Sequence, residues 1–135
     1  MTRVWERLWL GSRRDAEELA VANPYLITAV ISLCEACITA KRRDVRYVHI
    51  PIEDAELVLA RKIDAVINAI AQNIRRGTVL LHCSEGVSRA PSLTAAWMHY
   101  IGYRDVDAAL AEIKLLRPIA NPSKTLFDSV KEHLK

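Results

Sequence analysis

A cysteine and an arginine in the pattern Cys-x5-Arg stand between an apolar run and the start of a helix. Cys83 directly follows the run Thr78–His82, and Arg89 stands just before Pro91. Because proline is tolerated in a helix only within the first turn, Pro91 predicts that a helix begins close to Arg89. A helix start presents free N–H groups and partial positive charge, which together bind anions such as phosphate. The segment is therefore a candidate phosphate site.

The residue types in this segment suit phosphoryl transfer. Gly86 supplies the backbone freedom that a tight loop needs, and the planar guanidinium of Arg89 matches two phosphate oxygens. The same positive field stabilises a thiolate at Cys83, which is a nucleophile toward phosphorus. His82 is interpreted as an orienting hydrogen-bond partner, since a thiolate needs no base. For a bare Cys-x5-Arg pattern the alternative is a buried cysteine without chemistry. The predicted substrate-binding residues are Ser84, Glu85, Gly86, Val87, Ser88 and Arg89.

Strand and helix patterns alternate along the chain around this segment. Strands are expected at Val4–Leu10, Leu26–Leu33, Val45–Ile52 and Thr78–His82, the last three as runs buried on both faces. Helices are expected from Arg13 to about Val21, over Leu57–Ile74, Pro91–Tyr100 and Asp105–Leu116, and from about Ser123 to Leu134. Ser12, Asp105 and Ser123 stand where helix N-caps belong. The order predicts an α/β fold with a central, mostly parallel β-sheet flanked by helices.

Composition limits the class of protein. The 135 residues predict one domain, 1–135, and a net charge of +3 does not favour a nucleic-acid binder. Charged residues interrupt every apolar run, so no membrane span is expected. Three cysteines and no signal-peptide pattern favour a cytoplasmic protein. Cys34 and Cys37 form a Cys-x-x-Cys pair without partner ligands, so no metal site is predicted.

The segment from His82 to Arg89, with His-Cys-x-x-Gly-x-Ser-Arg, resembles the signature of cysteine-dependent protein tyrosine phosphatases, and its Gly-Val-Ser-Arg form resembles the small dual-specificity branch. The likeness extends to Leu8–Ser12, Pro51–Asp54 and Arg117–Pro122. The resemblance implies the phosphatase-like fold and a cofactor-free reaction through a phosphocysteine. It also implies that Asp54 is the acid that protonates the leaving group, with Glu53 and Glu56 as competing assignments.

Two positions depart from the family pattern or add to it. Members commonly carry Ser or Thr after the signature arginine, whereas this chain has Ala90, which predicts slower breakdown of the phosphoenzyme. Ser88 and Ser92 are the nearby hydroxyls. Some members place a cysteine at the position of Cys34 that protects the nucleophile as a disulfide, and the alternative is a small buried hydrophobe.

The expected substrate is a phosphorylated protein and the expected state is a monomer. The short segment before Gly11 leaves little chain to deepen the pocket, which favours phosphoserine and phosphothreonine together with phosphotyrosine. Ser84, Glu85 and Val87 include no cation, and Glu85 would repel extra phosphates, which favours a monophosphate over a polyphosphorylated lipid or an RNA 5′ end. The alternatives are a phosphoinositide or other non-protein phosphatase, and a non-catalytic phosphate-binding module.

Overall fold

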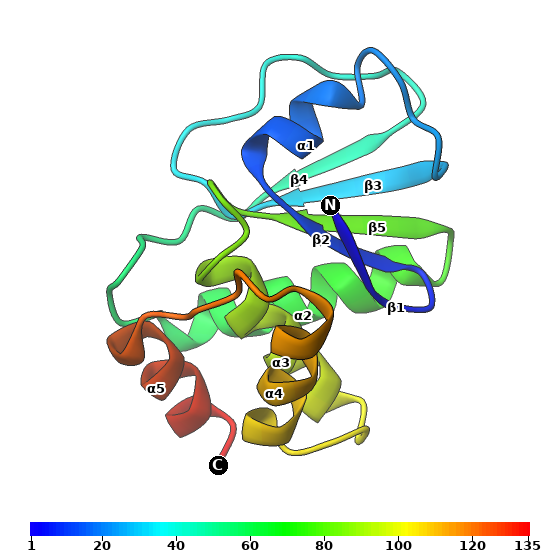
Figure 1. Ribbon diagram of the computed structural model, residues 1–135. Helices are drawn as coiled ribbons and strands as arrows, with labels where there is room; N and C mark the ends of the chain where they lie inside the picture. Colours follow the sequence, from blue (N-terminus) through cyan, green and yellow to red (C-terminus); the bar gives the residue numbers. More distant parts are fainter.

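A computed structural model describes all residues, 1–135, around a five-stranded sheet (Figure 1). The strand order is β1-β2-β5-β3-β4, and all neighbouring pairs are parallel except β1 with β2. The predicted α/β fold with a mostly parallel central sheet is confirmed. The strands are β1 (Thr2–Trp5), β2 (Leu8–Gly11), β3 (Ile27–Ser32), β4 (Arg46–His49) and β5 (Thr78–His82).

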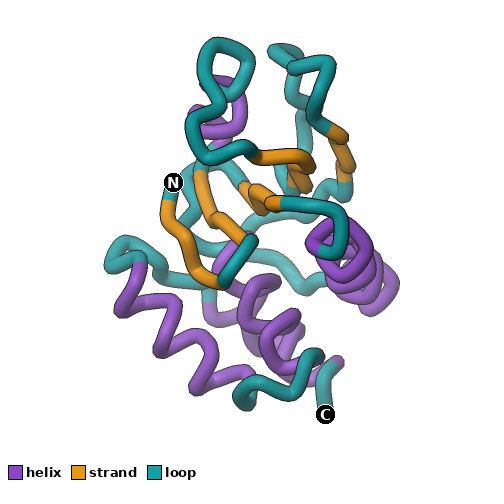
Figure 2. Tube along the Cα trace, turned by 90° about the vertical axis from the view of Figure 1, so that its right-hand side faces the viewer, coloured by secondary structure: helices purple, strands orange, loops and turns teal.

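Helices cover both faces of the sheet unequally. One short helix, α1, lies on one face, and the other four lie on the opposite face (Figures 1 and 2). Ser12 caps α1 in a reciprocal capping box with Asp15, and the side chains of Asp105 and Ser123 cap α4 and α5, as predicted. The helices are α1 (Arg13–Glu18), α2 (Ala60–Ile74), α3 (Arg89–Tyr100), α4 (Val106–Leu116) and α5 (Lys124–His133).

The first predicted strand is wrong in one respect, because Val4–Leu10 is a hairpin and not one strand. A turn at Glu6 and Arg7 separates β1 from β2, and the two strands pair antiparallel. The charged pair Glu6-Arg7 marks this turn without the glycine or asparagine that usually signals one. The Arg7 carbonyl then accepts a hydrogen bond from Val79 N at 2.8 Å, which fixes the hairpin beside β5.

Further boundaries differ from the sequence prediction, and two of them change which residues are buried. The predicted strand Val45–Ile52 shortens to β4, which lies at the sheet edge and is exposed or half-buried along its length, so it is not buried on both faces. The helix predicted from Leu57 begins at Ala60 instead. Leu57 is 72% exposed, so this leucine does not contribute to the apolar helix face that its spacing suggested.

Two hydrophobic clusters hold the layers together. The larger cluster of 30 buried residues fills the space between the sheet and helices α2 to α5. The smaller cluster of 7 residues lies under α1. No helix combines the length and the apolar character needed to cross a membrane.

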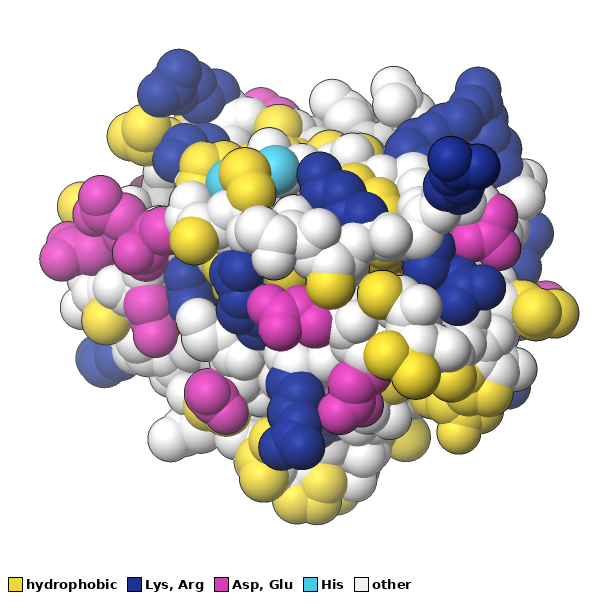
Figure 3. Space-filling view, turned by 90° about the horizontal axis from the view of Figure 1, so that it is seen from above, with side chains coloured by type: hydrophobic (Ala, Val, Ile, Leu, Met, Phe, Trp, Pro, Cys, Tyr) yellow, Lys and Arg dark blue, Asp and Glu magenta, His cyan; other side chains and the backbone are white.

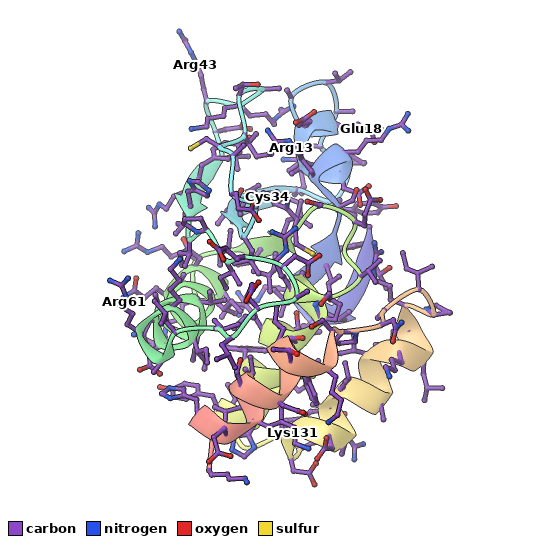
Figure 4. The ribbon with its side chains drawn as sticks, turned by 90° about the vertical axis from the view of Figure 1, so that its left-hand side faces the viewer. Arg13, Glu18, Cys34, Arg43, Arg61 and Lys131 are labelled. Atoms are coloured by element: carbon purple, nitrogen blue, oxygen red, sulfur yellow. The ribbon has the colours of Figure 1, made fainter.

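The parallel strands bring three chain segments to one edge of the sheet. His82, the last residue of β5, is in register with Gly11 of β2 and Ser32 of β3. The loops that follow these strands therefore leave the sheet side by side, as expected at the carboxyl edge of a parallel sheet. Figure 4 views this side of the molecule, with Cys34 near its middle and Arg13 beside it.

Candidate active site

The segment predicted to cradle a phosphate is the loop between β5 and α3. Cys83 follows β5 directly, and α3 begins at Arg89, which confirms the helix start that Pro91 predicted. The N-cap residue Ser88 makes no side-chain capping bond. No backbone carbonyl accepts a hydrogen bond from the N–H groups of residues 84–88. Free N–H groups at a helix start are the arrangement that binds an anion.

A cavity of about 260 Å³ opens over this loop. Asp54, in the loop after β4, and Cys83, which is 29 residues later in the chain, both line this cavity. The competing carboxylates Glu53 and Glu56 are exposed and do not line the cavity. Of the predicted residues, His82 and Gly86 lie outside the lining. The lining residues are Asp54, Cys83, Ser84, Glu85, Val87, Ser88 and Arg89.

Arg89 is buried, and only part of its guanidinium has partners. Its Nη1 donates to the Ile52 carbonyl at 3.0 Å, and its Nη2 donates to Ser84 Oγ at 2.8 Å. Its Nε is buried without any acceptor. An unpaired buried donor on a charged group is costly, so a site that retains one is suited to an anion that supplies the missing acceptor.

Cys83 is 2% exposed, and the N–H of Ala90 lies 3.4 Å from its Sγ. An N–H directed at sulfur favours negative charge there. The neighbouring hydroxyls are engaged elsewhere: Ser88 Oγ accepts from Ser123 N at 2.9 Å, and Ser92 Oγ donates to the Ser88 carbonyl at 2.8 Å. The hydrogen of the Ser92 hydroxyl is therefore used by that carbonyl, whereas Ser88 Oγ keeps its own hydrogen while it accepts from Ser123.

His82, the residue before Cys83, is fully buried. Its Nδ1 lies 3.1 Å from the Cys83 carbonyl and its Nε2 lies 2.6 Å from Ser32 Oγ. A carbonyl only accepts, so Nδ1 carries the hydrogen and Nε2 accepts the hydroxyl proton of Ser32. Burial lowers the pKa of His82 to about 4. The ring is therefore neutral at pH 7 and holds the backbone of Cys83 in place.

Arg117 contacts the loop of residues 84–88, a role that the sequence did not predict. This buried side chain donates from Nε to the Gly86 carbonyl at 2.9 Å and from Nη2 to the Glu85 carbonyl at 3.2 Å. Gly86 has φ +71, and a Cβ there would stand 2.5 Å from Arg117 Nη2. Glycine is thus required both by the backbone conformation and by the approach of Arg117.

The Asp54 loop contains a strained residue. Ala55 has φ +60, a left-handed conformation that costs a non-glycine residue about 1 kcal/mol or more. Its N–H donates to Asp54 Oδ1 at 2.9 Å. This hydrogen bond sets the direction of the Asp54 carboxylate at the rim of the cavity.

Cys34, for which the resemblance implied a protective disulfide, is buried close to the site. Cys34 Sγ lies 3.8 Å from Nδ1 of His82, the residue before Cys83. All three cysteines are free thiols, so a protective disulfide between Cys34 and Cys83 stays a prediction. No group of three His, Cys, Asp or Glu side chains is arranged to hold a metal ion.

Comparison with known proteins agrees with this geometry. The family model "Dual specificity phosphatase, catalytic domain" matches residues 8–135. Dual specificity protein phosphatase 15 of Homo sapiens is 32% identical over 130 residues, which cover 93% of this chain and 43% of the human protein. Dual specificity protein phosphatase 18 of Rattus norvegicus is 25% identical over 132 residues, 96% of this chain and 65% of that protein. The chain thus spans 43% and 65% of the length of these two relatives.

Solved structures extend the likeness to three dimensions. The crystal structure of DUSP15 superposes with a TM-score of 0.88 at 30% identity, covering 99% of this chain and 86% of that one. Human DUSP28 superposes with a TM-score of 0.87 at 21% identity, over 99% and 95% of the two chains, and so shares the fold. The chain therefore belongs to the dual-specificity phosphatase family, as a small, atypical member.

Proposed function

We propose that this chain hydrolyses phosphate monoesters of tyrosine, serine and threonine in proteins through a phosphocysteine intermediate. The observation that carries the proposal is the unpaired, buried Nε of Arg89 in the cavity that also holds Cys83 and Asp54. Cleavage of a phosphate monoester requires a group that binds the anionic phosphate, a nucleophile and an acid, and Arg89, Cys83 and Asp54 match these requirements.

In the first step Cys83 Sγ attacks phosphorus. The S–P bond forms while the P–O bond to the substrate oxygen breaks and its electron pair leaves with that oxygen. Asp54 donates its proton to the leaving oxygen. The N–H groups of residues 84–88 and the Arg89 guanidinium stabilise the charge on the three equatorial phosphoryl oxygens.

In the second step water attacks the phosphocysteine. Asp54, now a carboxylate, takes a proton from the water as the new P–O bond forms. The S–P bond breaks, its electrons return to Cys83 as a thiolate, and inorganic phosphate leaves. Ser84 keeps Nη2 of Arg89 oriented in both steps through its 2.8 Å hydrogen bond.

The charge at the cavity supports a monophosphate substrate. Arg89 is its only cationic lining residue, and Glu85 and Asp54 are anionic, so additional phosphates would meet repulsion. On the face covered by α1, Lys and Arg side chains are interspersed with Asp and Glu (Figure 3). This mixed surface gives little attraction for a polyanion such as RNA.

Turnover of para-nitrophenyl phosphate with no added metal tests the phosphatase activity. We expect activity in the unmodified chain, inhibition by vanadate and loss of activity in Cys83→Ser. In Arg89→Lys we expect kcat/KM to fall by about 100-fold or more, because lysine lacks the planar fork. Phosphate binding without any turnover would instead establish the non-catalytic module.

Substrate class requires a second assay with the same enzyme. Phosphopeptides carrying phosphotyrosine, phosphoserine or phosphothreonine are compared with phosphatidylinositol monophosphates and bisphosphates in vesicles. We expect phosphate release from peptides of all three kinds. A higher kcat/KM for the lipids than for every peptide would overturn the proposal that proteins are the substrates.

A further inference from the structure

A second cysteine–histidine pair lies outside the phosphate cavity, in the loop after β3. Cys37 is exposed, and its Sγ lies 3.1 Å from Nδ1 of His49, a residue at the end of β4. Nothing in the proposed phosphatase reaction uses either side chain. A thiol at hydrogen-bond distance from an imidazole is the arrangement by which proteins activate a sulfur nucleophile.

The protonation of the His49 ring follows from its second contact. Its Nε2 lies 2.6 Å from the Cys34 carbonyl. A carbonyl oxygen only accepts hydrogen bonds, so Nε2 carries the hydrogen of the neutral ring. Nδ1 therefore presents a lone pair to Cys37 and can take the thiol proton. The Cys34 carbonyl both orients this base and stabilises the imidazolium that proton transfer forms, as a third group does in catalytic triads.

A fixed cation holds the loop that carries the thiol. Arg13 of α1 donates from Nη1 to the Ala36 carbonyl at 3.0 Å and from Nη2 to the Cys37 carbonyl at 2.8 Å. In Figure 4 Arg13 lies beside the segment of Cys34. The third side of this guanidinium is paired with Glu17, whose Oε1 lies 2.8 Å from Arg13 Nε. Arg13 therefore limits movement of the loop away from His49.

We propose that Cys37 is a reactive thiol, activated by His49, and a modification site for hydroperoxides that is separate from the nucleophile Cys83. After proton transfer to His49, the Cys37 thiolate attacks one oxygen of hydrogen peroxide. An S–O bond forms, the O–O bond breaks, and the departing hydroxide takes the proton from the imidazolium and leaves as water. Sulfur loses two electrons, peroxide gains them, and Cys37 becomes a sulfenic acid.

The modified residue stands close to the phosphate cavity along the chain. Cys37 lies two residues after Glu35, whose carboxylate is 3.5 Å from Nη1 of Arg89. Cys34 lies in the same loop but is 3% exposed, so it is the internal comparison for a thiol without access to solvent. The inference itself stands on the Cys37–His49 geometry and does not depend on phosphatase activity.

Alkylation with iodoacetamide, read by mass spectrometry after cleavage at glutamate, tests the proposal on the full chain. Cleavage at Glu35, Glu53 and Glu85 places the three cysteines on three different peptides. We expect Cys37 to react at least about tenfold faster than Cys34 in the folded protein. In His49→Gln, which keeps a donor toward the Cys34 carbonyl but has no base, the Cys37 rate falls about tenfold. The matched control His133→Gln leaves it unchanged.

Oxidation is measured on the same peptides with hydrogen peroxide and dimedone, which captures sulfenic acid. We expect dimedone on Cys37 in Cys83→Ser, where the competing nucleophile is absent, and about tenfold less in Cys83→Ser combined with His49→Gln. Circular dichroism establishes that each variant is folded. If His49→Gln is not folded, His49→Phe replaces it. Equal Cys37 rates with and without His49 would overturn the proposal, as would alkylation of Cys37 no faster than that of Cys34.

Discussion

The carboxylate of Glu35 lies 3.5 Å from Nη1 of Arg89, in contact with the guanidinium that lines the phosphate cavity. The two side chains differ sharply in environment, since that of Arg89 is 5% exposed and that of Glu35 is 67% exposed. The arginine is therefore fixed while the carboxylate is free to move into solvent. Glu35 occupies part of the positive field that a phosphate dianion would also use.

Glu35→Gln removes this competing charge. Because solvent screens the exposed Glu35 carboxylate, the pair is worth about 0.2–1 kcal/mol. We therefore expect KM for para-nitrophenyl phosphate and Ki for vanadate to fall by up to about fivefold. The value of kcat stays within about twofold, because Arg89 keeps its bonds to Ile52 and Ser84. Steady-state kinetics at low ionic strength measure both constants, with Glu132→Gln as control. A KM that rises would mean that Glu35 positions Arg89 instead.

Asp54→Asn removes the proposed proton donor while preserving its size. We expect kcat for phenyl phosphate and for phosphoserine peptides to fall about 100-fold or more, because their leaving oxygens need a proton. Para-nitrophenolate leaves without one, so the loss for para-nitrophenyl phosphate is much smaller. Glu53→Gln and Glu56→Gln serve as controls and stay within about twofold. Equal losses for good and poor leaving groups would count against Asp54.

Ala90 offers Cys83 an N–H but no hydroxyl. Loss of the thiolate from the phosphoenzyme is therefore expected to be the slow step, giving a burst of about one para-nitrophenol per enzyme in stopped-flow kinetics. In Ala90→Ser a charge-assisted hydrogen bond to the departing sulfur speeds this step, and kcat rises about tenfold while the burst shrinks. A linear time course from the first turnover of the unmodified chain would refute the slow step.

The buried His82 makes stability depend on pH. Its pKa is about 4 in the folded chain and 6.5 for an ordinary histidine. The unfolded chain therefore takes up a proton first as pH falls, and stability drops between pH 6.5 and 4 by roughly 3 kcal/mol. Above pH 6.5 the ring is neutral in both states and contributes no slope. Urea unfolding at several pH values measures the drop, and His82→Gln should lack this part of it; an unchanged slope would contradict the assignment.

Local signals in the sequence were sufficient for much of the fold. Ser12 with Asp15, and the caps Asp105 and Ser123, each act within three residues, so their helix starts were predictable. Pro91 likewise located the start of α3. The break between β1 and β2 had no such signal, because Glu6 and Arg7 are ordinary residues whose turn is fixed by pairing with β5.

The candidate site also contains residues that a local pattern identified and residues that it did not. Cys83 and Arg89 share one loop, and their pattern with Gly86 identified it. Ser32 and Arg117 could not be found in this way, because Ser32 binds His82 and Arg117 binds the loop from distant parts of the chain. Neither stands in a local pattern that indicates its partner, so their roles emerge only when the sheet and helices are assembled.

The hydrogen bond from Arg117 Nη1 to Thr2 Oγ1, at 2.8 Å, joins residues 115 positions apart while the same guanidinium grips the loop of Gly86. Arg117 is synthesised after His82, the last residue of the sheet, so this contact can form only once the chain of all five strands has been made. A nascent chain can thus complete its sheet well before its catalytic loop acquires final shape. Enzymatic competence should consequently lag behind the appearance of the sheet during synthesis.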